Sequence, residues 1–166
     1  MRRRLITSSL ALFALAAAGC GGGGDSGGGS SGMHSSGSVA VRDSSLGKIL
    51  VDGSGRTIYL FEKDSGGRSA CSGACAKAWP PLTVTGRPTA GDGASAKLLG
   101  TVRRADGTME VTYGGHPLYR FAGDRKAGDT NGQGTKAFGA EWYALGASGA
   151  KVEKESKPSS GGYGGY

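Results

Sequence analysis

Two cysteines four residues apart have the clearest capacity for chemistry in this chain. Cys71 and Cys75 stand in Cys-Ser-Gly-Ala-Cys, shortly before Trp79-Pro80-Pro81. In an oxidising compartment such a pair forms a disulfide, whereas a reduced pair could bind Cu(I) through soft thiolates or exchange disulfides. A copper site needs further ligands, for which His116 and Met109 are the candidates. We favour the disulfide, because the Trp-Pro-Pro segment indicates a loop packed against the core.

A second candidate is a run of oxygen-bearing side chains at alternate positions, Asp129, Asn131 and Gln133, followed by Gly134. This spacing partly resembles a calcium loop, in which alternate residues turn inward to coordinate the ion. The twelfth position of such a loop is Ala140 instead of an acidic residue. We therefore favour a turn-rich loop whose side chains bond to its own backbone, and no metal site.

Enzyme motifs are not found in the sequence. It contains no nucleophile elbow, no metal-binding pair of histidines and no phosphate-binding loop. Asp64 and Asp124 could act as a carboxylate pair only if the fold placed them together. A role in capping turns is simpler, so we expect a protein that is not an enzyme and that needs no cofactor.

The two aspartates belong to a pattern that occurs twice. In each half, Tyr-x-Phe-x-x-Asp is followed by a tryptophan: Tyr59, Phe61, Asp64 and Trp79, and then Tyr119, Phe121, Asp124 and Trp142. A Tyr and a Phe two residues apart on a strand share one face. The Asp follows where the strand ends and can accept hydrogen bonds from turn amides. We interpret these residues as structural, with two similar half-cores that bury each other and a Trp covering each aromatic pair.

The elements that carry this pattern are predicted to be strands. Asp-Gly at 106–107 and a glycine-rich segment at 52–55 are turn signals between runs of β-branched and aromatic residues. The one expected helical piece is 72–79, which the two prolines end. The fold class is thus mainly β, a small antiparallel β domain of two pseudo-repeated halves with one short helical turn, and its strands are expected at 48–51, 56–61, 99–102, 109–113, 117–121 and 141–145.

The first twenty residues form the pattern of a lipoprotein signal. Arg2, Arg3 and Arg4 precede an apolar run at 5–18, and small residues lead to Cys20. We predict a signal peptide at 1–19 and lipidation of Cys20 after cleavage. Lipidation would also leave the other two cysteines as an even pair.

The β domain is expected at 39–150, between two tails. Residues 20–38 are nearly all Gly and Ser and predict a flexible tether, and 151–166 predict a flexible Gly/Tyr tail. Loss of residues 1–19 removes three arginines, so the formal net charge falls from +7 to +4. That excess suits anionic lipid or a wall polymer, whereas no basic run interleaved with aromatics predicts nucleic-acid binding.

Several motifs, in order, resemble a known family over residues 38–146. They are Gly-x-x-Leu-Val-Asp with Gly-Arg-Thr at 47–57, Tyr-x-Phe-x-x-Asp at 59–64, Cys-Ser-Gly-x-Cys with Trp-Pro-Pro-Leu at 71–82, Tyr-x-Gly-x-Pro-Leu-Tyr at 113–119 and Gly-Asp-Thr-Asn-Gly-Gln-Gly at 128–134. The chain is similar to bacterial predicted lipoproteins with a Tyr-x-(Phe/Trp/Tyr)-x-x-Asp motif, also described as a secreted repeat of unknown function. It departs at Ile58 and Glu110, where Leu and Gln are commoner. The resemblance implies an envelope lipoprotein and no established activity.

These observations predict a lipid-anchored protein on the extracytoplasmic side of the cell membrane. We expect a non-catalytic binding or structural module, with the membrane as one partner through the lipid and an envelope protein or wall polymer as another. The alternative is a Cu(I)-binding or thiol-redox envelope protein that uses Cys71 and Cys75.

Overall fold

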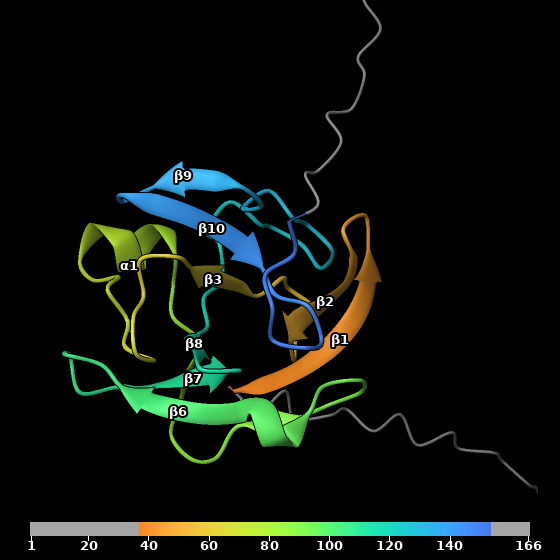
Figure 1. Cartoon of the computed structure of the whole chain (residues 1–166), viewed down its shortest axis with the longest axis horizontal. Coiled ribbons are helices and arrows are strands. Elements are labelled where there is room, and N and C mark those ends of the chain that lie inside the picture. The colour runs from red at the N-terminus through yellow and green to blue at the C-terminus, as the bar shows by residue number, and fades with distance from the viewer. Residues whose placement is uncertain (1–36, 154–166) are drawn as a thin grey trace, which may run out of the picture. The chain divides into compact units, whose positions relative to one another are not determined.

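The computed structural model describes residues 37–153 (Figure 1). The predicted signal peptide at 1–19, the predicted lipidation of Cys20 and most of the predicted tether and tail lie outside the described residues. Between residues 37 and 153, no helix is long and apolar enough to span a bilayer.

The described chain is mainly β, as predicted. Its one α-helix is α1 (Ala74–Ala78), and a 3-10 turn covers Ala96–Leu98. The strands are β1 (Ser38–Ser44), β2 (Gly47–Asp52), β3 (Tyr59–Phe61), β4 (Thr83–Val84), β5 (Thr89–Ala90), β6 (Leu99–Arg103), β7 (Met109–Tyr113), β8 (His116–Pro117), β9 (Thr135–Ala137) and β10 (Ala140–Ala144).

The strands form three small sheets. Their orders are β2-β1-β5, β3-β10-β9 and β4-β7-β6, with β8 added to β7. Every pairing in these sheets is antiparallel except the short parallel contact of β1 with β5. In Figure 1, β9 and β10 lie on one side of the domain and β6 and β7 on the opposite side. The predicted hairpin of 99–102 with 109–113 is the β6–β7 pair.

The first half of the domain is completed by a strand from the second repeat. Ile58 donates its backbone N–H to the carbonyl of Leu50 at 3.0 Å, and Leu50 donates to Leu145 at 2.7 Å. Leu145 closes the set by donating to Ile58 at 3.2 Å. Because Leu145 follows the second Tyr-x-Phe-x-x-Asp motif, the C-terminal segment is built into the N-terminal half.

The second half repeats this arrangement with a segment of the first repeat. Leu118 donates to the carbonyl of Val111 at 3.0 Å, Val111 donates to Leu82 at 2.8 Å, and Leu82 donates to Leu118 at 2.8 Å. All three side chains are buried. The two halves therefore have the same plan and exchange one segment each.

Two apolar clusters fill the interior. One is mainly aliphatic and contains the six residues whose backbone hydrogen bonds are described above. The other contains the aromatic residues of the motif and the two cysteines. At about 25 cal/mol for each Å² of apolar surface removed from water, clusters of this kind supply the main driving force for folding.

The structure differs from the predicted elements in several places. Strand β1, which pairs with β2 in register from Val39 opposite Asp52, was not predicted. The short strands β4, β5 and β9 were not predicted either. Of the segment predicted as a strand at 117–121, only residue 117 belongs to a strand, β8. The rest does not pair with one neighbouring strand, because its backbone changes partner along the chain: Tyr119 bonds Tyr59, and Arg120 bonds Pro80. The helix is also shorter than the predicted 72–79.

The segment exchange predicts that neither half folds alone. Fragments 37–98 and 99–153, produced separately, should lack near-ultraviolet circular dichroism and a cooperative melt, because each lacks the strand that completes its sheet. Mixed in equal amounts, they should recover both signals. A monomeric fragment 37–98 that melts cooperatively by itself would contradict this account.

Candidate functional site

The motif aromatics form one stack that crosses between the repeats. Trp79 and Trp142 lie face to face, with ring centroids 3.9 Å apart and planes 5° from parallel. Phe61 of the first repeat stacks on Trp142 of the second at 4.0 Å, and Phe121 of the second packs on Trp79 of the first at 4.4 Å. Such pairs contribute about 0.5–1.5 kcal/mol beyond area burial. Each Trp therefore covers the Phe of the other half as well as its own Tyr, which it meets edge-on.

The motif tyrosines and aspartates are exchanged in the same way. Tyr59 donates its hydroxyl to Asp124 Oδ2 at 2.7 Å, and Tyr119 donates to Asp64 Oδ2 at 2.7 Å. The two tyrosines also exchange backbone hydrogen bonds of 2.9 and 3.0 Å. The expected turn bonds are present as well: Asp64 accepts the N–H of Ala70, and Asp124 accepts the equivalent bond from residue 131. Each aspartate therefore joins its own loop to the tyrosine of the other half.

The surroundings of the two motif tyrosines keep both hydroxyl groups protonated. Burial, together with the hydrogen bond to Asp124, raises the pKa of Tyr59 well above its usual range. Burial also raises the pKa of Tyr119 in the same direction. Both hydroxyls stay protonated donors at neutral pH, and both tyrosine side chains are fully buried. The two tyrosines therefore act as internal structure. Of the two aspartates, Asp124 is buried, whereas Asp64 is half-buried.

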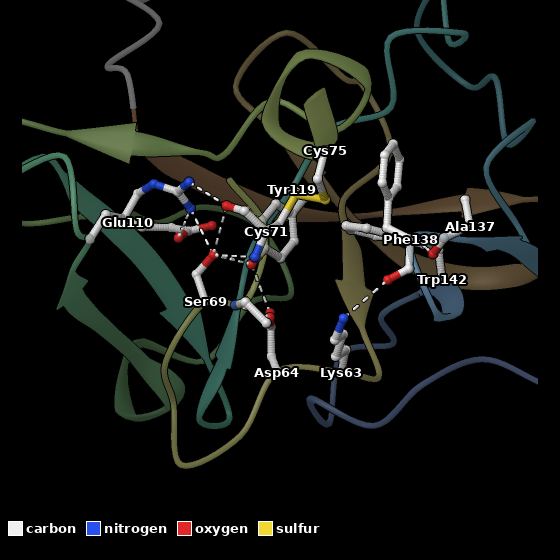
Figure 2. Close-up of a disulfide and its surroundings, with 12 residues drawn as sticks. Lys63, Asp64, Ser69, Cys71, Cys75, Glu110, Tyr119, Ala137, Phe138 and Trp142 are labelled. Carbon is white, nitrogen blue, oxygen red and sulfur yellow. Dashed lines mark hydrogen bonds and ion pairs between the residues drawn. A yellow bond between two sulfur atoms is a disulfide. The ribbon is translucent and has the colours of Figure 1, made fainter. Parts of the chain in front are cut away.

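The two cysteines form a disulfide beside this stack, as the sequence favoured (Figure 2). Their Cα atoms lie 5.2 Å apart. Cys71 is 1% exposed and Cys75 is 6% exposed, with Cys75 in α1 against the aromatic cluster. Both sulfur atoms are thus used in a covalent bond inside the core.

Arg104 joins the disulfide loop to the second half. Its side chain is 5% exposed, and its Nη2 donates to the carbonyl of Cys71 at 2.6 Å. Nη1 donates to Ser69 Oγ at 2.8 Å and to Glu110 Oε2 at 2.7 Å. Ser69 Oγ in turn lies 2.7 Å from the hydroxyl of Tyr119. This guanidinium therefore fixes the segment before the disulfide through several bonds at once.

Glu110 is a buried acid in this network. It is 0% exposed, and its second carboxylate oxygen, Oε1, has no hydrogen-bond partner within the described chain. Burial raises the pKa of Glu110 to about 7, against the opposing effect of Arg104 and with added repulsion from Asp64 and Asp106. Breaking such a pair strands an uncompensated buried charge and is strongly destabilising.

An open groove lies over the disulfide loop and the end of β6. We call it the arginine groove, with a volume of about 860 Å³ and lined by Arg68, Cys71, Ala76, Val102, Arg103 and Arg104. Arg68 and Arg103 are exposed, whereas Arg104 is buried in its floor. The groove thus joins two walls that are far apart in sequence, and it has cationic groups on both.

The structure does not bring the predicted copper ligands together. His116 lies in β8 and lines a separate hollow with Phe61 and Asp64. Met109 lies in β7 opposite Val84. Between residues 37 and 153, no group of three or more His, Cys, Asp or Glu side chains is placed to hold a metal ion.

The loop compared above with a calcium site uses its oxygen atoms internally. Asp129 Oδ2 accepts the backbone N–H groups of Arg125 and Lys126. Gln133 Oε1 accepts the N–H of Ala144 at 2.9 Å, and its Nε2 donates to the carbonyl of residue 152 at 2.6 Å. These side chains shape the loop and tie it to β10 and the segment that follows.

Sequence reasoning missed Arg104 and the groove it supports. The available signal was Glu110, an acid in the strand Met-Glu-Val-Thr-Tyr, because a carboxylate within a buried strand requires a cation or donor beside it. Nothing in the sequence identified Arg104, instead of its neighbour Arg103, as that cation.

The chain was compared with known proteins. A family model described as a secreted repeat of unknown function matches residues 40–83 and 100–145, which are the two repeats. No curated protein and no solved structure matches the chain.

The buried acid predicts a pH-dependent stability. Because the unfolded chain releases this proton near pH 4.3 and the folded protein near pH 7, the free energy of unfolding should fall between those values, by on the order of 2–3 kcal/mol. Glu110→Gln should remove that fall, so its stability relative to wild type should rise from pH 5 to pH 8. Denaturant melts across this range measure it. Glu62→Gln, which changes an exposed pair with Lys151, is the control and should follow wild type. Parallel curves for wild type and Glu110→Gln would show that Glu110 does not titrate there.

The disulfide predicts a modest loss on removal. It closes a ring with a sequence separation of 4, so the chain-entropy effect is about 2 kcal/mol. The Cys71→Ser and Cys75→Ser double variant should still fold, with a free energy of unfolding lower by about 2 kcal/mol, as measured by denaturant melts. A loss several times larger would show that the bond also holds the Arg104 network in place.

Proposed function

The chain belongs to the family of secreted repeats of unknown function, and from this premise we propose that it is a lipid-anchored cell-envelope protein that acts as a non-catalytic binding or structural module. The family is one of secreted proteins, so the chain works outside the cytoplasm. The lipid anchor and the binding or structural role are our proposal.

The observation that carries this proposal is the internal use of the motif. The residue types in the repeats that could serve catalysis, Tyr59, Tyr119, Asp64 and Asp124, are hydrogen-bonded to one another across the halves. A catalytic acid or base must come within hydrogen-bond reach of a substrate. The motif is built to hold a rigid shape, which suits a module that displays a surface.

The proposed anchor and tether fit this role. A diacylglyceryl group at Cys20 would bury several acyl chains, each CH₂ contributing about 0.8 kcal/mol. The Gly/Ser-rich composition between Cys20 and β1 predicts a flexible linker with too little apolar surface to fold. The folded domain would then reach envelope partners near the membrane on the extracytoplasmic side.

The second candidate is a Cu(I)-binding or thiol-redox protein that uses Cys71 and Cys75. Either activity needs the disulfide reduced, since thiolates are the metal ligands and nucleophiles. Copper analysis by mass spectrometry on freshly isolated protein, with and without reductant, distinguishes the candidates. One Cu(I) for each chain after reduction, absent from the Cys71→Ser and Cys75→Ser double variant, would favour this candidate over a structural disulfide.

The anchor predicts the result of changing one residue. Cys20→Ser should release the protein into the medium or leave it uncleaved, because the lipid would be lost, and detergent-phase partitioning measures it. The Cys71→Ser and Cys75→Ser double variant is the control and should partition like wild type. Equal detergent partitioning of Cys20→Ser and wild type would overturn the lipid anchor.

A further inference from the structure

We propose that the arginine groove binds phosphate groups of an extended anionic polymer of the cell envelope, a chain of polyol or sugar units joined by phosphodiesters. This inference rests on the proposed function as an envelope binding module and names the chemistry of its partner. It concerns residues that have no part in the repeated motif.

The groove has an exposed cation on each wall. Arg68 lies in the turn closed by its backbone bonds with Ser65, and Arg103 ends β6 on the other wall. Neither guanidinium forms an ion pair with another residue of the described chain, whereas Arg42, Arg104 and Arg120 do. A planar guanidinium offers paired donors that match the oxygens of a phosphate. Arg68 and Arg103 are thus available to a ligand on two sides of one groove.

The groove is formed before any ligand binds, because its walls are bonded to each other. Arg104 directly follows β6, which forms one wall, and it bonds Ser69 and the carbonyl of Cys71 in the other wall. Its bond to Glu110 in β7 holds its own side chain in place. The two walls therefore have a fixed separation. The disulfide closes the loop that carries Ser72 and Gly73 at the rim. Figure 2 shows Ser69, Glu110 and Tyr119 gathered beside this disulfide. A preformed site avoids the ordering cost that weakens binding by mobile loops.

One acid, Asp106, also lines the groove. Its Oδ1 accepts two hydrogen bonds from Thr108, and its Oδ2 lies 3.5 Å from Arg104 Nε. Its side chain is 57% exposed, so a ligand at the rim meets its negative charge. The two exposed arginines, Arg68 and Arg103, outweigh this single negative charge.

The shape of the site favours a polymer over a membrane surface. A groove of about 860 Å³ is large for one small anion and is lined by both polar groups and apolar Ala76 and Val102. Arginines on opposite walls of a hollow can both reach a chain that lies between them. A flat bilayer would meet the rim of the hollow first and would leave its floor unfilled.

The test measures binding of a synthetic poly(glycerol phosphate) oligomer by the lipidated full-length protein in detergent, using calorimetry at low and at physiological salt. Wild type should bind, more weakly at higher salt. Arg68→Ser with Arg103→Ser should weaken binding roughly tenfold or more, because two charge-assisted contacts are lost. Arg56→Ser with Arg125→Ser removes the same charge from exposed arginines outside the groove, and it should bind like wild type. Ser72→Asp, which adds a carboxylate at the exposed rim, should also weaken binding.

Several outcomes overturn the inference, and they can be told apart from a failure of the anchor. Equal losses in both arginine pairs would indicate general charge attraction, and equal affinity for poly(glutamate) would show that phosphate is not what the groove recognises. Binding to phosphatidylglycerol vesicles that depends on Arg68 and Arg103, without binding to the oligomer, would assign the groove to lipid headgroups. A lipidated protein that fails to bind overturns this inference and leaves the anchor standing. If the exported wild-type protein binds the oligomer but is found to carry no lipid at Cys20, this inference stands and the anchor is overturned.

Discussion

The hydrogen bonds from Tyr59 to Asp124 and from Tyr119 to Asp64 determine how the rest of the domain is arranged. A buried tyrosine hydroxyl without an acceptor costs about 1–3 kcal/mol, and here the acceptor always comes from the other half. The same exchange occurs in the Phe–Trp stacking and in the backbone segments that contain Leu82 and Leu145. Because each half lacks parts that the other supplies, the two repeats form one cooperative unit.

The two halves are alike in their core, and they differ where we propose that binding occurs. The backbone bonds place Val111 of the second half where Leu50 stands in the first. One residue earlier, Glu110 therefore occupies the position of the buried Ile49. An acid at an aliphatic position needs a buried cation, which Arg104 supplies, and Arg104 then reaches across to the disulfide loop. The difference between Ile49 in the first repeat and Glu110 in the second thus accounts for the Arg104 network. It also accounts for the groove beside the β6–β7 hairpin, which occurs in the second repeat.

Domains of this size have a limited core, so they depend on additional constraints. In this chain the disulfide is buried against the aromatic cluster, and Asp52 of the first half forms an ion pair with Arg120 of the second. The disulfide closes a loop that runs into α1, and the ion pair joins the end of β2 to the segment after β8. They stiffen the surface that the domain presents, as the proposed role of a binding or structural module requires.

The sequence by itself determined the fold class, the two repeats and the disulfide. Alternating apolar residues, Asp-Gly turns and the spacing of Tyr, Phe and Asp are local signals, and local chemistry decides strands, turns and a five-residue ring. The direction of the exchange was decided only by the tertiary structure. Tyr59 lies as many positions before Asp64 as Tyr119 lies before Asp124, so the spacing cannot show that each tyrosine bonds the distant aspartate. The choice of Arg104 over Arg103 as the buried cation was decided in the same way, because it depends on which face of β6 meets Glu110 and the loop of Cys71. Contacts between segments far apart in the chain are set by packing, and packing is a property of the folded whole.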